Sequence, residues 1–296
     1  MIVDVHAHVL ARPVLRKSRT SDLRFMSAEE QVRRMDEKGI AKAVILPLTS
    51  AEVSAEKQSV GEVLEVCDRY PGRFIPFCDV DPRRCDWCTA EDFRWALEQY
   101  REAGCRGLGE VTARLPFDDP RVFALFSACE QVGFPVTFHT APPEVNTYGL
   151  IDEFGLPRFE KALQQFPDLT YFGHSAAFWS EISGDLVPQT KEGYPEGPVT
   201  PGGTLVRLFR QYPSLHGDLS AGSGFNMLTR DPAFTYEFAD EFQDRLLLGL
   251  DHTDATLDFQ HIEWLQSACQ DGHISAEALD KILWRNADRI LGLGLG

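Results

Sequence analysis

Residues 1–10 of the chain read MIVDVHAHVL and place one acid and two histidines at alternate positions of an apolar run. Alternate residues of an extended strand project from the same face, so this pattern predicts Asp4, His6 and His8 on one side of a strand. Two imidazoles on one strand face can bind the same metal ion. The alternative is a half-buried strand whose polar face meets water, as in antiparallel sheets. The metal interpretation requires further ligands elsewhere in the chain.

The length and composition are typical of a globular protein with one large domain. The chain has 296 residues, which fits a single α/β barrel domain over residues 1–296. It contains no apolar run of about 18 residues and no basic leader, so we expect a soluble, cytoplasmic protein. Its formal net charge of −16 disfavours nucleic acid and anionic membranes as partners. We expect a small-molecule substrate as the partner, and a homodimer remains an open alternative.

The cysteines do not form an obvious disulfide framework. There are seven of them, scattered along the chain, and an odd number favours reduced thiols in a reducing compartment. Cys85 and Cys88 form one C-x-x-C motif. Without a second pair, this motif is a weak indication of zinc binding or redox chemistry.

Apolar runs rich in β-favouring residues recur at regular intervals along the chain. They lie at residues 2–7, 43–48, 74–80, 106–111, 135–140, 170–174, 215–219 and 246–250. Helical segments with recognisable start signals separate them, such as the stretch from Ser27 to Glu30, whose helix is expected to close at Gly39. Intervals of about 30 to 45 residues, each with one helix, predict parallel strands joined by right-handed crossovers.

Eight such units predict a closed (β/α)8 TIM barrel. The competing fold is a doubly wound open sheet, which usually carries a glycine-rich phosphate turn after its first strand. In this chain, that position holds His6 and His8 instead. The absence of a Gly-x-Gly-x-x-Gly motif after any predicted strand therefore favours the barrel.

Polar residues follow the predicted strands in a pattern that suggests one site. In a parallel barrel, catalytic groups gather at the carboxyl ends of the strands, where the loops form the open face. The candidates at strand ends one, four, five, six and eight are His6, His8, Glu110, His139, His174 and Asp251. Because independent accidents would not place so many metal-binding side chains at one end, the sequence predicts a metal centre there.

Several motifs extend this prediction to a family. They are Asp4-x-His6-x-His8, Phe138-His139-Thr140, Gly173-His174, Gly249-Leu250-Asp251 and the closing segment 282–293. In these motifs, and over nearly its whole length, the chain resembles the amidohydrolase superfamily. The resemblance is closest to the amidohydrolase-related branch, which contains aminocarboxymuconate semialdehyde decarboxylase and several lactonases and hydratases. It implies a (β/α)8 barrel, distorted from the ideal form.

The resemblance also implies a metal site and catalytic residues. His6, His8, His139 and Asp251 are implied to hold one divalent ion, with zinc as the expected metal and Mn²⁺ as an alternative. Neutral imidazoles and one carboxylate leave the ion positive, so a coordinated water can lose its proton near neutral pH. Asp251 can accept that proton, while His174 can orient the water or polarise the substrate.

Glu110 is open to two interpretations. It is similar to the fourth-strand glutamate of TatD-like deoxyribonucleases in the same superfamily, which implies a second metal held together with His174. Alternatively, its carboxylate holds an imidazole N–H or pairs with Arg106 without contacting a metal.

Substrate-binding residues are sought in the loops at the same face. The loop after the first strand is rich in basic residues, so Arg16 and Arg19 are expected to bind an anionic group. Asp218, at the seventh strand end, and His252, beside Asp251, are further candidates for substrate contact. The alternatives are a solvated basic surface and ordinary turn residues.

The segment after the sixth predicted strand begins with Trp179 and continues as a Gly- and Pro-rich stretch to residue 203. It is too irregular for a long helix and long enough to cover the mouth of the barrel. We therefore expect a lid-like insertion there, with Trp179 in contact with substrate. The alternative is an arm that packs against a neighbouring subunit.

The predicted function is that of a metal-dependent hydrolase, in which a metal-activated water attacks a small ester, lactone or amide carbonyl of an anionic substrate. The alternative is a nonoxidative decarboxylase or hydratase, a lyase acting on a small unsaturated or aromatic acid, because related proteins use the same ligands for that chemistry. A ligand-binding barrel without turnover is a third reading. It predicts decayed ligand positions, whereas here each position holds a competent residue.

Overall fold

Over residues 1–84 and 88–296, which the computed structural model describes, eight parallel strands form a barrel. They are β1 (Val3–Ala7), β2 (Lys42–Ile45), β3 (Phe74–Pro76), β4 (Leu108–Val111), β5 (Val136–Ala141), β7 (Tyr171–His174), β8 (Leu215–Asp218) and β9 (Leu246–Leu247). Each strand overlaps one of the predicted runs, and helices separate them along the chain. The predicted (β/α)8 barrel is therefore confirmed.

Two hydrogen-bonded sheets meet edge to edge to close the barrel. One has the order β1-β2-β3 and the other the order β4-β5-β7-β8-β9. Beyond β3, the Cys78 N–H donates to the Gly107 carbonyl at 3.0 Å, and beyond β9 the Leu248 carbonyl accepts from the Val5 N–H at 2.9 Å. A short strand that the sequence did not predict, β6 (Leu150–Ile151), pairs with the end of β5.

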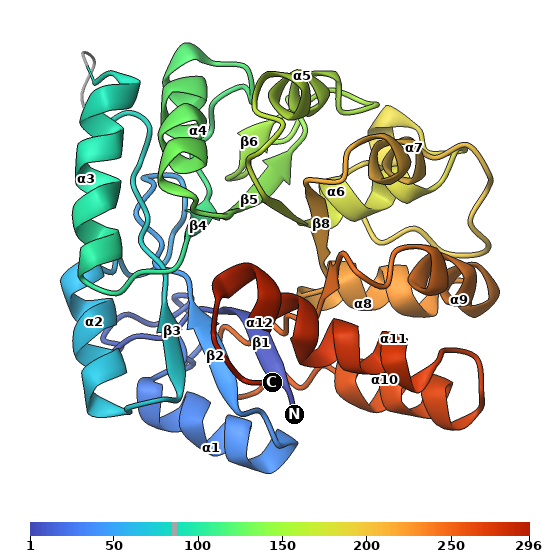
Figure 1. Ribbon diagram of the computed structural model, residues 1–296, viewed down its shortest axis with the longest axis horizontal. Helices are drawn as coiled ribbons and strands as arrows, with labels where there is room; N and C mark the ends of the chain where they lie inside the picture. The colour runs from blue at the N-terminus through green and yellow to red at the C-terminus, as the bar shows by residue number, and fades with distance from the viewer. Residues whose placement is uncertain (85–87) are drawn as a thin grey trace.

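Helices form a layer around the strands (Figure 1). The longer ones are α1 (Ala28–Lys38), α2 (Val60–Arg69), α3 (Ala90–Glu102), α4 (Pro120–Val132), α5 (Pro157–Gln165), α7 (Thr204–Gln211), α8 (Ala221–Thr229), α9 (Pro232–Glu241) and α10 (His261–Gln270). The shorter ones are α6 (Ala176–Trp179), α11 (Ala276–Asp280), α12 (Asn286–Leu291), the 3-10 turns η1 (Ser180–Ile182) and η2 (Pro188–Thr190), and the π-helical turn η3 (Lys281–Arg285). None of the described helices has the length and apolar character needed to cross a membrane.

Helix α1 shows why its limits could be predicted. The Ser27 side chain accepts a hydrogen bond from the Glu30 N–H at 3.2 Å, and the Glu30 carboxylate accepts from the Ser27 N–H at 3.0 Å. This capping box satisfies N–H groups that have no partner within the helix. The helix ends at Gly39, whose φ of 69° is left-handed and costs glycine little. The predicted start and stop are both confirmed.

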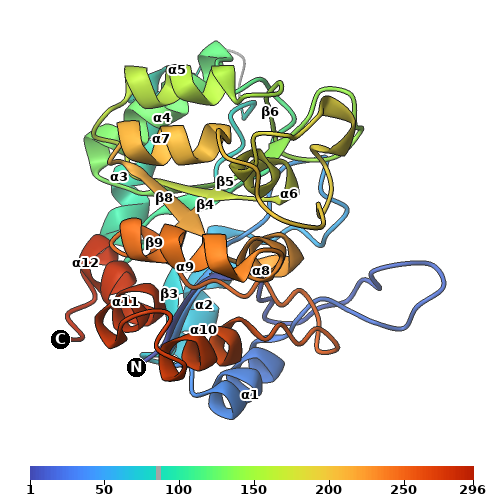
Figure 2. The same ribbon diagram turned by 90° about the vertical axis from the view of Figure 1, so that its right-hand side faces the viewer.

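The amino ends of the strands are closed by an apolar plug. Val3, Val5 and Phe77 form one buried cluster with Ala287 and Leu291 of α12. Figure 2 shows both termini and α12 at this end of the barrel, while the loops that follow the strands extend from the other end. Side chains at the plugged end therefore serve packing, and the carboxyl ends form the open face.

The segment of residues 183–203 contains η2 and is otherwise irregular. A buried ion pair anchors it, with Lys191 Nζ 2.9 Å from Glu181 Oε1 and both side chains 1% exposed. Glu192 and Tyr194 of the same segment line a cavity at the barrel mouth. This location suits a lid. Its movement, and the alternative of a subunit contact, stay predictions.

The C-x-x-C motif falls partly outside the described residues, because Cys85, Asp86 and Trp87 are not among them. The structure therefore does not test a zinc or redox role for this motif. The free thiols identified in the described part of the chain are Cys67, Cys78, Cys105, Cys129 and Cys269.

Candidate metal centre

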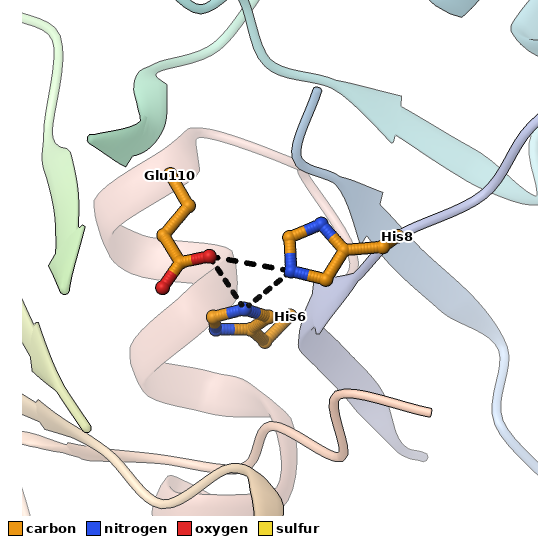
Figure 3. Close-up of side chains that lie close together, drawn as sticks. All are labelled: His6, His8 and Glu110. Carbon is orange, nitrogen blue, oxygen red and sulfur yellow. Dashed lines mark hydrogen bonds and ion pairs between the residues drawn. The ribbon is translucent and has the colours of Figure 1, made fainter. Parts of the chain in front are cut away.

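Side chains with metal-binding atoms meet at the carboxyl ends of the strands. Within the described chain they are His6, His8, Glu110, His139, His174 and Asp251. They form overlapping groups of three in which the ligand atoms all lie within 4.8 Å of one another. Figure 3 shows His6, His8 and Glu110 pointing toward one another. Barrel closure thus unites residues from both ends of the chain.

The two histidines of the opening motif present nitrogen atoms to the same point. His6 Nδ1 lies 2.6 Å from Asp218 Oδ2, and His8 Nδ1 lies 2.8 Å from the Leu46 carbonyl. Both partners are acceptors, so each Nδ1 carries a proton, and each Nε2 offers its lone pair once the ring is neutral. The two Nε2 atoms are only 3.1 Å apart. Two lone pairs at this distance repel unless a cation lies between them, so the pair fits a metal ion.

Asp4, by contrast, does not join the two histidines. The pairing register of β1 with β2 shifts between Asp4 and Ala7, which interrupts the simple alternation of faces. Asp4 Oδ1 accepts the His6 N–H at 3.0 Å and the Leu250 N–H at 2.9 Å. The expectation of one shared face is therefore wrong for Asp4, which instead ties β1 to the segment that carries Asp251.

Glu110 lies between two pairs of histidines. Its Oε2 atom is 3.3 Å from His8 Nε2 and 3.8 Å from His6 Nε2. Its Oε1 atom is 2.9 Å from His139 Nδ1 and 3.8 Å from His174 Nε2. A carboxylate with each oxygen directed at a different pair can bridge two cations. The contact with His139 Nδ1 agrees with the alternative in which Glu110 holds an imidazole N–H, and a second metal held together with His174 stays a prediction.

Asp251 has a buried carboxylate oxygen that lacks a partner. Among the described residues, none forms a hydrogen bond with its Oδ1 atom. That atom lies 3.5 Å from His8 Nε2 and 3.9 Å from His6 Nε2. The backbone of Asp251 has a left-handed φ of 52°, which strains a residue other than glycine. A buried acceptor without a donor is costly, so this oxygen also fits a bound cation.

The charges at the site explain the shifted pKa values. Burial lowers the pKa of His6, but Asp218, Asp251 and Glu110 outweigh burial and raise it to about 10. Burial raises the pKa of Asp251. Burial and the nearby His6 lower the pKa of His174 to about 3. The carboxylates therefore favour a positive charge beside His6, while His174 stays a neutral imidazole with a usable lone pair.

Neighbouring groups hold these side chains in place. Ser220 Oγ lies 2.8 Å from His174 Nδ1 and 3.2 Å from His6 Nδ1, so one hydroxyl contacts both rings. A Cβ atom at Gly249 would lie 2.3 Å from Asp218 Oδ1 and 3.0 Å from His6 Cβ. Only glycine permits this close approach, so the site depends on tight backbone packing as well as on its ligands.

The metal-binding side chains open into a cavity with two lobes. The first, which we call the Lys17 lobe, has a volume of about 200 Å³. The second, which we call the Glu192 lobe, has a volume of about 290 Å³. The residues that line both lobes are His139, Tyr148, His174, Asp251 and Thr253. The Tyr148 ring lies 4.5 Å from the His139 ring, at the boundary of the lobes.

The basic loop after β1 contributes a different cation from those predicted. Arg16 is exposed and pairs with Asp22 at 3.0 Å, and Arg19 is exposed as well. Figure 2 shows this loop extending away from the barrel. Lys17, instead, lines the first lobe, with its Nζ atom 2.8 Å from Thr253 Oγ1. The side chains of Arg16 and Arg19 extend into solvent, and the substrate contact expected of them stays a prediction.

The other three substrate candidates lie behind the cavity wall. Trp179 is 3% exposed, and its indole N–H donates to the Asp218 carbonyl at 2.9 Å. The Asp218 side chain is fully buried against His6. His252 is fully buried, and its ring stacks on Phe259 at 5.7 Å. Core packing and the contact with His6 occupy these side chains, and the substrate contact expected of Trp179, Asp218 and His252 stays a prediction.

Sequence reasoning missed Tyr148, Glu192 and Tyr194 as cavity residues. All three lie in loops that follow β5 and β7, and polar residues in such loops are candidates for the open face. Loops lack the periodicity that predicts side-chain direction in strands and helices. Their position in sequence was therefore a signal, but their orientation required the tertiary structure.

Solved structures with similar folds support the barrel assignment. An uncharacterized TIM-barrel protein from Bordetella bronchiseptica is 22% identical, with 89% of this chain and 82% of that chain covered and a TM-score of 0.58. The 2,6-dihydroxybenzoate decarboxylase from Rhizobium is 15% identical, with 99% and 98% covered and a TM-score of 0.57. The 4-oxalomesaconate hydratase from Rhodopseudomonas palustris is 12% identical, with 99% and 96% covered and a TM-score of 0.54. At these identities, the similarity shows the fold alone.

Curated protein sequences gave no significant match. The amidohydrolase family model, in contrast, matches residues 3–293, which is almost the whole chain. That range includes every side chain of the candidate metal centre. The resemblance drawn from the strand-end motifs is thus confirmed. The chain belongs to the amidohydrolase family of metal-dependent enzymes.

Proposed function

We propose that this enzyme is a hydrolase with two divalent metal ions, which cleaves a small ester, lactone or amide that carries an anionic group. The observation that carries this proposal is the position of Glu110, whose two carboxylate oxygens are directed at different histidine pairs. Two-metal sites commonly serve hydrolytic reactions. The mononuclear site implied by the resemblance is the simpler alternative.

The residues at the site suit zinc, with Mn²⁺ as a further candidate. His6, His8 and Asp251 would hold one ion together with Glu110 Oε2, and His139 and His174 would hold the other together with Glu110 Oε1. Imidazole nitrogens and carboxylate oxygens are ligands that zinc commonly takes in proteins. When bound, such ions lower the pKa of water and polarise a carbonyl.

The side chains of the protein would transfer protons and keep the metal-binding histidines in position. With its Oδ1 atom directed at an ion, the Asp251 carboxylate would accept the proton of the attacking water through Oδ2, which lies 4.0 Å from His174 Nε2. It can return that proton to the leaving group. Asp218 and Ser220 would keep His6 and His174 in orientation through their contacts with Nδ1 atoms.

The position of Lys17 supports the proposal that the substrate is anionic. Its ammonium group contacts Thr253 Oγ1 at 2.8 Å and Asp254 Oδ2 at 2.5 Å, and it lines the first lobe. An ammonium group has three donors, so these contacts leave one for a substrate carboxylate. The same lobe is lined by Phe25 and Leu48, which suit the apolar part of a small acid.

Nonoxidative decarboxylation or hydration is the second candidate function. The apolar wall formed by Phe25, Leu48 and Val53 would also accept a flat unsaturated or aromatic acid. Two of the similar structures are a decarboxylase and a hydratase, which makes a lyase reaction a reasonable alternative at this site. Because a single ion can serve hydrolysis as well as these reactions, product analysis rather than metal count separates the candidates.

Metal stoichiometry and product analysis test the proposal. Metal-free protein is titrated with Zn²⁺ or Mn²⁺, and bound metal is measured by elemental analysis. We expect about two ions per chain for the unmodified protein and at most about one for Glu110→Gln, since the amide lacks the bridging charge. Arg16→Ala serves as the matched control and should bind as much metal as the unmodified protein.

Products are then measured on a panel of esters, lactones, amides and unsaturated acids. Release of a new acid without carbon dioxide supports hydrolysis. Carbon dioxide release without bond hydrolysis would reject the proposed reaction in favour of the lyase. A single bound ion that is unaffected by Glu110→Gln would reject the two-metal site.

A further inference from the structure

The Glu192 lobe of the cavity contains an acidic side chain, Glu192, with which no described residue forms an ion pair. Glu192 lines this lobe together with Tyr148, Tyr194 and Ser223. Its Oε2 atom is buried, and no described residue forms a hydrogen bond with it. Within the described ranges, Glu192 also forms no ion pair with a lysine, an arginine or a histidine. Such a carboxylate is costly to bury, so it is a candidate for contact with a ligand.

The nearest lysine along the chain does not neutralise Glu192. Lys191 is fully engaged, because its Nζ atom lies 2.9 Å from Glu181 Oε1 and 2.6 Å from the Glu153 carbonyl. These contacts hold the backbone on which Glu192 sits. Burial accordingly raises the pKa of Glu192, with His139 as the main opposing charge. Among the described residues, the Glu192 carboxylate is therefore left without an ion-pair partner.

The two lobes differ in the charged group that each adds to the metal-binding side chains. The first has the Lys17 ammonium group on its wall, and the second has the Glu192 carboxylate. Asp251 and His174 lie on the shared wall between them. A substrate whose scissile bond lies over the shared wall would thus place one end beside a cation and the other beside an anion. The best partner for an unpaired carboxylate is a cationic donor, because such charge-assisted hydrogen bonds are the strongest available.

We propose that Glu192 selects substrates with an ammonium group, so that the substrate class is a small zwitterionic amide or ester. In such a substrate, an amine lies on one side of the scissile bond and a carboxylate on the other. This inference rests on the proposed hydrolase function and identifies which substrates it favours. When the acyl part of such an amide carries the amine, hydrolysis consumes one water, breaks the C–N bond, and yields two amino acids, with the hydroxyl on the acyl carbon and a proton on the leaving nitrogen.

Three matched compounds test the inference with the metal-loaded protein. β-Alanylglycine carries the ammonium group, 3-hydroxypropionylglycine replaces it with a hydroxyl, and N-propionylglycine replaces it with a methyl. Binding is measured by calorimetry and turnover by release of glycine. We expect the unmodified protein to favour β-alanylglycine over N-propionylglycine by about tenfold to a hundredfold in Kd and in kcat/KM.

Glu192→Gln should remove this preference and leave the binding of N-propionylglycine unchanged, because the amide keeps the shape of the side chain but not its charge. The change should lie in KM rather than in kcat. Glu196→Gln, an exposed position in the same segment, is the matched control and should keep the preference. A circular dichroism spectrum and metal content equal to those of the unmodified protein establish that the variants are folded.

The outcomes separate this inference from the proposed function. Turnover of all three compounds at equal rates would support hydrolysis and overturn the role of Glu192. Preferential binding of β-alanylglycine without turnover would support the role of Glu192 and count against hydrolysis. Equal binding of the hydroxyl and ammonium compounds, or no binding of any compound, would overturn the zwitterionic class.

Discussion

Two buried histidines at opposite ends of the barrel differ in what their surroundings favour. At the mouth, His6 is surrounded by Asp218, Asp251 and Glu110, which overcome burial and raise its pKa to about 10. At the plugged end, burial lowers the pKa of His216 to about 4, and the nearby arginines act in the same direction. The difference shows that neighbouring charge, rather than burial, decides which end attracts a cation.

The same contrast extends to polar groups in general. The mouth buries carboxylates such as Asp251, which keeps an oxygen without a donor in the described chain. The plugged end is filled by apolar contacts between strands and α12, including Val5 and Leu291. Buried carboxylates at one end and apolar contacts at the other are expected where the first end performs the chemistry and the second supplies stability.

The largest expected effect is that of Asp251→Asn at the mouth. It should lower kcat by about a thousandfold, or about 4 kcal/mol, because the amide cannot accept the proton of water. In metal-free protein, the same change should raise the melting temperature, since it removes a buried charge without a partner. Steady-state kinetics and calorimetry with a chelator measure the two effects. Retention of more than a tenth of the activity would contradict the role of Asp251.

At the plugged end, Leu291→Ala should lower the stability of the protein and leave its activity almost unchanged, the reverse of what is expected for Asp251→Asn. Removal of this buried side chain, which is 4% exposed, should cost about 3 kcal/mol of the free energy of unfolding. Urea unfolding measures this cost. Metal content and kcat should stay within about twofold of the unmodified protein, because the plug does not contact the mouth. A matching loss of metal would show that the two ends are coupled.

The low pKa of His216, at the plugged end, predicts how the free energy of unfolding depends on pH. Its folded-state pKa of about 4 lies below the ordinary value of 6.5, so the unfolded state binds its proton first as the pH falls. The stability that this group contributes is therefore present above pH 6.5 and is lost between that pH and about 4. The loss should reach about 2 kcal/mol at roughly pH 5.

His216→Gln should remove that part of the pH dependence. The comparison of interest is the difference in unfolding free energy between the unmodified protein and the variant, measured by urea titration from pH 8 to pH 5. A constant difference across that range would show that His216 titrates alike in the folded and unfolded states.

The smallest effect is expected for the basic loop. Arg16→Ala and Arg19→Ala should change KM for a carboxylate substrate by less than about twofold, because both side chains are exposed. Lys17→Met should raise that KM by about tenfold, since it removes the cation of the first lobe. Steady-state kinetics of the three variants tests the contrast. A larger effect of either arginine would mean that the loop folds over the mouth when substrate binds.

The strands were predictable because their apolar runs and their spacing are properties of the local sequence. The positions of His139 and His174 followed, since a strand end in a parallel barrel lies at a known face. Asp218 shows the limit of this reasoning. It lies at a strand end as expected, yet its side chain contacts His6, and only closure of the barrel between β1 and the segment after β9 reveals this contact.

Loop residues were less predictable, for a physical reason. Lys17 lines the cavity while Arg16 and Arg19 do not, although the three lie within four positions of one another. The direction of Lys17 depends on contacts with Thr253 and Asp254, which are distant in sequence. Local sequence patterns contain no information about such contacts. The concentration of positive charge could therefore indicate which loop lies near the cavity, but not which of its residues lines it.

The buried pair of Lys191 and Glu181 has a consequence for how this enzyme could acquire new substrates. This ion pair holds the loop in place, whereas the neighbouring residues Glu192 and Tyr194 line the cavity at the mouth. Anchoring and recognition thus reside in different side chains of one short stretch. Exchanges at the two recognition positions could redirect the enzyme toward other molecules without rebuilding the loop itself.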